Sequence, residues 1–155
     1  AAGIAVSVLP DVDVIAFHLG IPYSSEFGHR GFSHSLMFAA MVALAGAAFH
    51  RPMSATSSNA FLFLFFSAAS HGILDAFTNG GLGIAFLWPF SDERYFAWAR
   101  VIEVSPIGLS SFLSAQGAAA FISELYWVWL PCAVGGGLLG LFRKGLIPLR
   151  SGLKR

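Results

Sequence analysis

The sequence has little charge. Asp, Glu, Lys and Arg make up 11% of its 155 residues, whereas hydrophobic residues make up 56%. An average soluble domain has about 25% charged residues. This deficit, together with a mean hydropathy of +0.71, excludes an ordinary soluble domain and predicts an integral membrane protein. The net charge is only +1, so nothing indicates a nucleic-acid partner.

Other absences further limit the possible folds and functions. The chain has one cysteine, Cys132, which cannot form an internal disulfide. It contains no internal repeat and no second, soluble domain, so residues 1–155 are expected to form a single membrane domain. It also lacks the His-Glu-x-x-His motif, which is typical of zinc-dependent proteases.

Apolar runs predict an all-α fold, a polytopic bundle of transmembrane helices. The expected spans are residues 35–49, 60–77 and 125–142, and residues 1–9 are expected to be the end of a further helix. A spanning helix needs about 20 residues, so the histidines that flank residues 35–49 are expected to lie in the interfacial zones. Residues 105–120 are small and weakly apolar, and we expect them to form a separate interfacial or re-entrant helix.

The basic residues predict the orientation. If residues 11–34 and 78–124 lie on one side of the membrane, seven of the eight acids lie there, and the eighth, Asp75, lies near the same end of its helix. The other side then holds six of the nine basic residues and no acid: Arg51, Arg143, Lys144, Arg150, Lys154 and Arg155. Basic residues in short loops favour the cytoplasm. We therefore predict a cytoplasmic C-terminal tail and an outward-facing 11–34 segment.

Histidines and aspartates gather in three stretches on the predicted outer side. His71 and Asp75 are four residues apart, so they share one helix face, and a charge inside a spanning helix is by default a candidate functional site. Alternative roles are a helix-end hydrogen bond for this pair and turn formation for the upstream aspartates. We favour a metal centre at the outer membrane–water interface, with six ligands: Asp11, Asp13, His29, His34, His71 and Asp75.

Mixed imidazole and carboxylate ligands suit Zn²⁺, with Mn²⁺ as a further candidate. Six ligands are too many for one tetrahedral zinc, so two or three ions that share an aspartate are expected. Such ions activate water and clamp phosphoryl oxygens, and Arg30 can hold a phosphate in bidentate fashion. We predict Arg30 and Asp13 as catalytic residues. His18 is a further candidate ligand. The sequence does not distinguish which of four acids could act as a base or support the ligands: Glu26, Asp92, Glu93 or Glu103.

The expected activity is metal-dependent hydrolysis of a phosphoester, either a small molecule or a lipid, because the site lies at the edge of the bilayer. A non-catalytic metal-binding or ion-transport protein is the first alternative. Its ligands would be expected nearer the midplane of the membrane. A metal-dependent protease or amidase is the second alternative.

Four stretches in this order resemble the YdjM-like family of membrane-bound, metal-dependent hydrolases of the inner membrane. They are Leu9-Pro10-Asp11-Val12-Asp13, His29-Arg30-Gly31-Phe32-Ser33-His34-Ser35, His71-Gly72-Ile73-Leu74-Asp75 with Thr78, and Trp88-Pro89-Phe90-Ser91. The resemblance runs from the start of the chain to about Pro106. It implies a distant similarity to zinc-dependent phospholipase C and the P1-type nucleases, an all-helical multi-zinc phosphoesterase site, and the six ligands named above.

Overall fold

The computed structural model describes residues 1–144, which are helical apart from loops and two isolated β-bridges. The α-helices are α1 (Ala2–Val8), α2 (Ile15–His18), α3 (Leu36–Ala47), α4 (Ser57–Ala76), α5 (Leu109–Phe112), α6 (Ala115–Glu124) and α7 (Leu130–Arg143). Three 3₁₀ segments, η1 (Leu9–Val14), η2 (Phe32–His34) and η3 (Arg51–Met53), and one π-helical segment, η4 (Leu125–Trp129), complete the set. The all-α prediction is confirmed. Arg150, Lys154 and Arg155 of the predicted basic tail lie outside the described residues.

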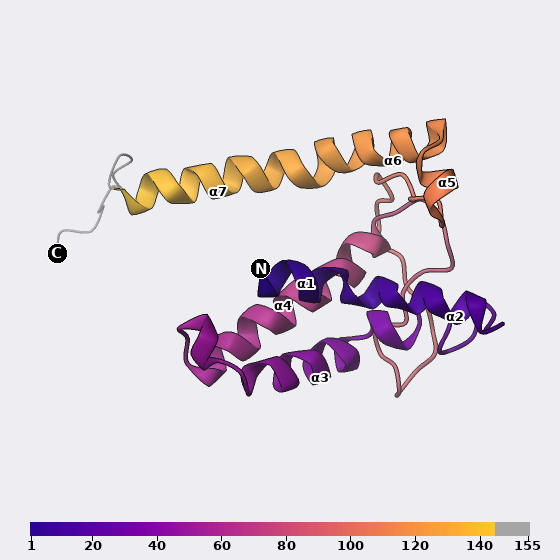
Figure 1. Cartoon of the computed structure of the whole chain (residues 1–155). Helices are drawn as coiled ribbons and strands as arrows, with labels where there is room; N and C mark the ends of the chain where they lie inside the picture. Colours follow the sequence, from indigo (N-terminus) through magenta and orange to yellow (C-terminus); the bar gives the residue numbers. More distant parts are fainter. Residues whose placement is uncertain (145–155) are drawn as a thin grey trace.

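Helix α4 is the centre of the fold, and α1 and α3 pack against it (Figure 1). Ala39 of α3 lies in one buried cluster with Ala68 and Ala69 of α4. A Cβ atom on Gly46 would lie 2.4 Å from the Leu64 side chain, so only a glycine fits there without movement. Small residues let two helices approach closely, which is typical of helix pairs in membranes.

Among residues 1–144, two helices are long and apolar enough to cross a membrane, Ser57–Ala76 and Ala115–Arg143. The first agrees with the predicted span 60–77. The second is one continuous helix of 29 residues, so the expected end of a helix at residue 120, before a separate last span, is wrong. Part of the expected 105–120 helix forms the short helix α5. Helix α3 has 12 residues, which is less than the length of about 20 that a span needs. The polytopic bundle stays a prediction.

The long helix α6–α7 stands apart from the other helices along most of its length (Figure 1). Its most apolar stretch is 0% buried, and large side chains such as Trp129 and Leu139 are 60% and 66% exposed. Exposed apolar surface of this extent indicates contact with the lipid bilayer or with another protein. The C-terminal end of α7 lies at the same end of the molecule as the connection between α3 and α4, opposite α2 (Figure 1).

Candidate metal centre

Three segments that are distant in the sequence bring the predicted ligands together. Buried Pro10 lies in η1, which holds Asp11 and Asp13. Segment η2 ends with His34, and the last turns of α4 hold His71 and Asp75. A Cβ atom on Gly72 would lie 2.9 Å from the main-chain oxygen of His34. The glycine therefore lets η2 lie directly against α4.

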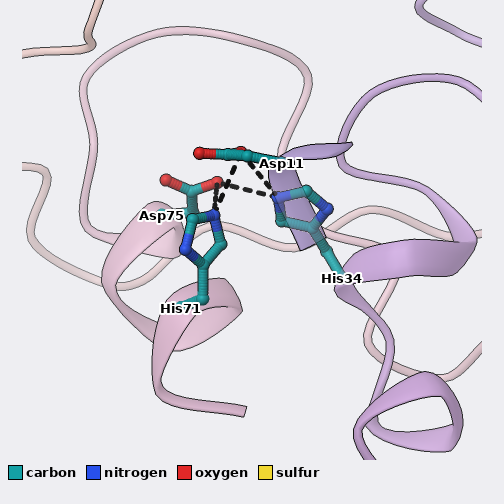
Figure 2. A group of neighbouring side chains, drawn as sticks. All are labelled: Asp11, His34, His71 and Asp75. Atoms are coloured by element: carbon teal, nitrogen blue, oxygen red, sulfur yellow. Dashed lines mark hydrogen bonds and ion pairs between the residues drawn. The ribbon is translucent and has the colours of Figure 1, made fainter. Parts of the chain in front are cut away.

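Asp11, His34, His71 and Asp75 point toward one another from these segments (Figure 2). The Oδ1 atom of Asp11 lies 3.1 Å from His71 Nε2 and 3.6 Å from His34 Nε2. The Oδ2 atom of Asp75 lies 3.3 Å from His34 Nε2 and 3.8 Å from His71 Nε2. All four candidate ligand atoms lie within 4.8 Å of one another. This arrangement fits a single divalent cation with two imidazole and two carboxylate ligands.

The Nε2 atom of His34 is the strongest indication of a bound cation. It is buried and has no hydrogen-bond partner within the described residues, although the carboxylates of Asp11 and Asp75 are close. Its distances of 3.6 Å to Asp11 and 3.3 Å to Asp75 are those of ion pairs without hydrogen-bond geometry. A metal ion held between these groups would bind this nitrogen directly.

Asp13 contacts His34 from the opposite side of its ring. One carboxylate oxygen of Asp13 lies 3.1 Å from His34 Nδ1 and also accepts hydrogen bonds from the Ser33 hydroxyl and the Arg30 main-chain N–H. The other oxygen lies 2.6 Å from His29 Nδ1. A carboxylate that binds one ring nitrogen fixes the tautomer and leaves the other nitrogen free to bind metal. Asp13, His29 and His34 also meet the distance requirement for a second metal group.

The Arg30 side chain is buried and is held by the same centre. Its Nε atom forms a 3.1 Å ion pair with Asp75 Oδ2, and Nη1 donates to the Thr78 hydroxyl and to the Gly80 main-chain oxygen. The backbone of Arg30 has φ +65°, a conformation that costs energy for a residue with a side chain and often marks functional sites. Arg30 therefore orients a predicted ligand, while its catalytic role stays a prediction.

The charges of the centre favour a bound cation. Burial alone would raise the pKa of Asp11, but its contacts with His34 and His71 hold it well below its usual range. Asp13 behaves likewise: His29, His34 and Ser33 lower its pKa against the effect of burial. Burial alone would lower the pKa of His34, but its three aspartate neighbours raise it to about 10. The aspartates thus hold a proton on His34 when no metal competes for the nitrogen.

A cavity of about 450 Å³ adjoins the ligands. Its lining includes Asp11, His29, Arg30 and Asp75, together with residues 104–108 and with Gln116 of α6. Glu124 of α6 also lines this cavity, although it is not among the candidates that the sequence singles out. The sequence could have indicated Glu124 as a site residue, because it is the one charged residue inside a long apolar run.

The weaker sequence candidates make contacts outside this centre. Glu26 accepts a hydrogen bond from Trp88, Glu93 from Tyr95 and Glu103 from Asn79. His18 and Asp92 lie in neither group of candidate ligands within the described residues. His50 contacts the Ala55 main-chain oxygen at the connection between α3 and α4, away from the centre, as expected.

Comparison with known proteins agrees with the membrane prediction. The chain is 47% identical over 139 residues to the inner membrane protein YbcI of Escherichia coli (strain K12), an alignment that covers 89% of this chain and 80% of the relative. No solved structure matches the chain, so the distant similarity to phospholipase C and the P1-type nucleases stays a prediction.

A family model described as "YdjM inner membrane protein" matches residues 1–144. This range includes every predicted ligand and both helices that are long enough to span a membrane. The chain therefore belongs to the YdjM inner membrane protein family.

Proposed function

We propose that this protein is a membrane-bound, metal-dependent hydrolase that acts on a phosphoester. The observation that supports the proposal is the convergence of Asp11, His34, His71 and Asp75 beside a cavity of about 450 Å³. These residues would hold a divalent cation, most simply Zn²⁺, which supplies Lewis acidity for a phosphoryl oxygen and for water. Asp13, His29 and His34 also meet the distance requirement for a second ion, but the hydrogen bonds that Asp13 accepts from Ser33 and the Arg30 N–H favour a single ion per chain.

The chain's own residues would bind and orient the substrate. His29, Arg30 and Thr78 line the cavity next to the ligands and present the positive charge and hydrogen-bonding groups that an anionic phosphate needs. Val104, Pro106 and Ile107 also line the cavity, so an apolar group of the substrate would lie beside them. This combination favours a lipid or another amphiphilic phosphoester over a fully polar one.

A metal carrier without catalytic activity is the competing proposal. Metal ions need no cavity of this size beside their ligands, and His71 and Asp75 lie in the last turns of α4 rather than at its middle. Transporter sites usually lie near the midplane of the membrane. Both observations favour hydrolysis at the interface over passage of ions.

The test measures bound metal and hydrolysis on the same purified full chain in detergent or nanodiscs. We expect at least one bound zinc per chain and turnover of phospholipid or lipid-phosphate substrates. His71→Ala and Asp75→Ala should each lower bound metal and activity strongly, because each removes a proposed ligand. His50→Ala is the matched control and should change neither. Full metal binding with no hydrolysis of any phosphoester would contradict the enzyme and favour the carrier.

A further inference from the structure

Glu124 has an unusual position in the chain. It is the one charged residue between positions 115 and 142, inside a helix that is long and apolar enough to span a membrane. A carboxylate in such a helix is costly, and it usually has a functional reason. Glu124 ends α6, and the π-helical segment η4 begins directly after it. Short π-helical segments occur frequently at functional sites.

Glu124 borders the metal centre from the side of α6. It lines the cavity of about 450 Å³ together with Asp11 and Asp75. It also lines a neighbouring cavity of about 340 Å³ together with His71 and Asp75. Both cavities include proposed ligands, so Glu124 faces the centre across space that a substrate and water can occupy.

The other carboxylates of the centre are already engaged. Asp11 and Asp75 contact histidines through the atoms that would bind metal, and both oxygens of Asp13 accept contacts from neighbouring groups. The Glu124 side chain is half-buried and forms no hydrogen bond or ion pair with any other residue in the range 1–144. It also lies outside both groups of candidate ligands among these residues. It is therefore a carboxylate beside the cavity that remains free to take a proton.

We propose that Glu124 is the general base of the hydrolysis described above, and this inference rests on that proposed function. One oxygen–phosphorus bond forms as water attacks the phosphoester, and the bond from phosphorus to the leaving alkoxide breaks. One proton of the attacking water passes to the Glu124 carboxylate and from there to bulk water. The leaving alkoxide takes one proton from bulk water, so the products are an alcohol and a phosphate, and Glu124 returns to its ionised form.

The first test compares Glu124→Gln with the unaltered chain, using metal-loaded protein and the best phosphoester substrate of the screen. Because the amide cannot accept the proton, kcat should fall by about 10²–10⁴-fold, as is typical for loss of a general base. Bound metal should stay unchanged. Glu124→Asp, which keeps the carboxylate one methylene further back, should retain part of the activity. Glu93→Gln, at an exposed glutamate that bonds Tyr95, is the matched control and should keep full activity.

The second test measures binding of inorganic phosphate to the metal-loaded protein by calorimetry and needs no turnover. The Glu124 carboxylate repels an anion in the cavity, so Glu124→Gln should bind phosphate as tightly as the unaltered chain or several-fold more tightly. Loss of metal or of phosphate binding in this variant would overturn the inference, since Glu124 would then support the centre instead of accepting a proton. Retained kcat would overturn it as well. An unaltered chain that binds metal but hydrolyses nothing would refute the proposed function itself, whereas activity in both proteins would refute only the role of Glu124.

Discussion

His34 contacts aspartates through both of its ring nitrogens. Its Nδ1 lies 3.1 Å from Asp13, and its Nε2 lies 3.3 Å from Asp75. The two aspartates therefore have different roles. Asp75 belongs to the proposed ligands around Nε2, whereas Asp13 contacts Nδ1, on the opposite side of the imidazole ring. Asp13 is predicted from the sequence as a ligand and catalytic residue, but its contacts with Ser33 and the Arg30 N–H favour a positioning role.

The Asp13→Asn variant tests this distinction. The asparagine would have nearly the same shape but no charge, so it would fix the His34 tautomer less firmly and make the ring a weaker ligand. We expect metal affinity to fall by about 10–100-fold, as for other outer supports of a metal-binding histidine, while the number of ions bound at saturating zinc stays the same. Asp92→Asn, at an exposed aspartate outside both groups, is the control. A loss of one whole ion per chain would instead make Asp13 a direct ligand of a second metal.

At the same scale, the types of the site residues were predictable, but their pairings were not. Histidine and aspartate are rare in this apolar chain, so their positions alone indicated the centre. The pairing of Arg30 with Asp75 depends on its φ of +65°. The turn at Arg30 also requires Gly31, because a Cβ atom at position 31 would clash with the main-chain oxygen of Glu26. No sequence pattern at these positions specifies the partner of the arginine.

At the scale of elements, predictions succeeded where the apolar run was unbroken. Helix α4 was expected over residues 60–77 and covers Ser57–Ala76, with Thr56 as its N-cap. The last helix was expected over residues 125–142 but begins at Ala115. Polar Gln116, Ser123 and Glu124 interrupt the hydrophobic pattern there. The helix nevertheless runs through them, and Gln116 and Glu124 line the cavity beside the metal centre.

The contact between η2 and α4 should depend on Gly72. In Gly72→Ala the new methyl group would meet the main-chain oxygen of His34, which would move His34 away from His71. We expect metal affinity to fall by about 10–100-fold, comparable to loss of an outer support, while the helix content by circular dichroism stays unchanged. Gly135→Ala is the matched control, since it also replaces a helical glycine but has no neighbour within 4 Å. Equal zinc affinity in both variants would show that this close approach is unimportant for the centre.

At the scale of the whole molecule, the chain combines a compact part with one long helix. Helices α1, α3 and α4 pack together, and η1, η2 and the end of α4 hold the ligands, while α6–α7 stands apart along most of its length (Figure 1). The connection between α3 and α4 lies at the opposite end of the molecule from α2 (Figure 1). The predicted orientation therefore requires α4 to cross the membrane, which its length of 20 residues permits.

Cysteine labelling tests this orientation in intact cells. The exposed native Cys132 is first replaced by alanine. A single cysteine is then introduced by Ser24→Cys, between Asp13 and His29, or by Ser54→Cys, in the connection between α3 and α4. Both serines are exposed, so a maleimide that cannot cross membranes reaches either position if that position is outside. Basic residues favour the cytoplasmic side, and Arg51 lies three residues from Ser54.

We expect the Ser24→Cys variant to react in intact cells and the Ser54→Cys variant to react only after the membrane is disrupted. The two positions serve as controls for each other, because they differ in their place along the chain but share the same exposed serine as starting residue. The reverse pattern would place the metal centre on the cytoplasmic side. Reaction of both positions from outside would show that α4 does not cross the membrane, and the centre would then lie on a helix that rests at the surface of the bilayer.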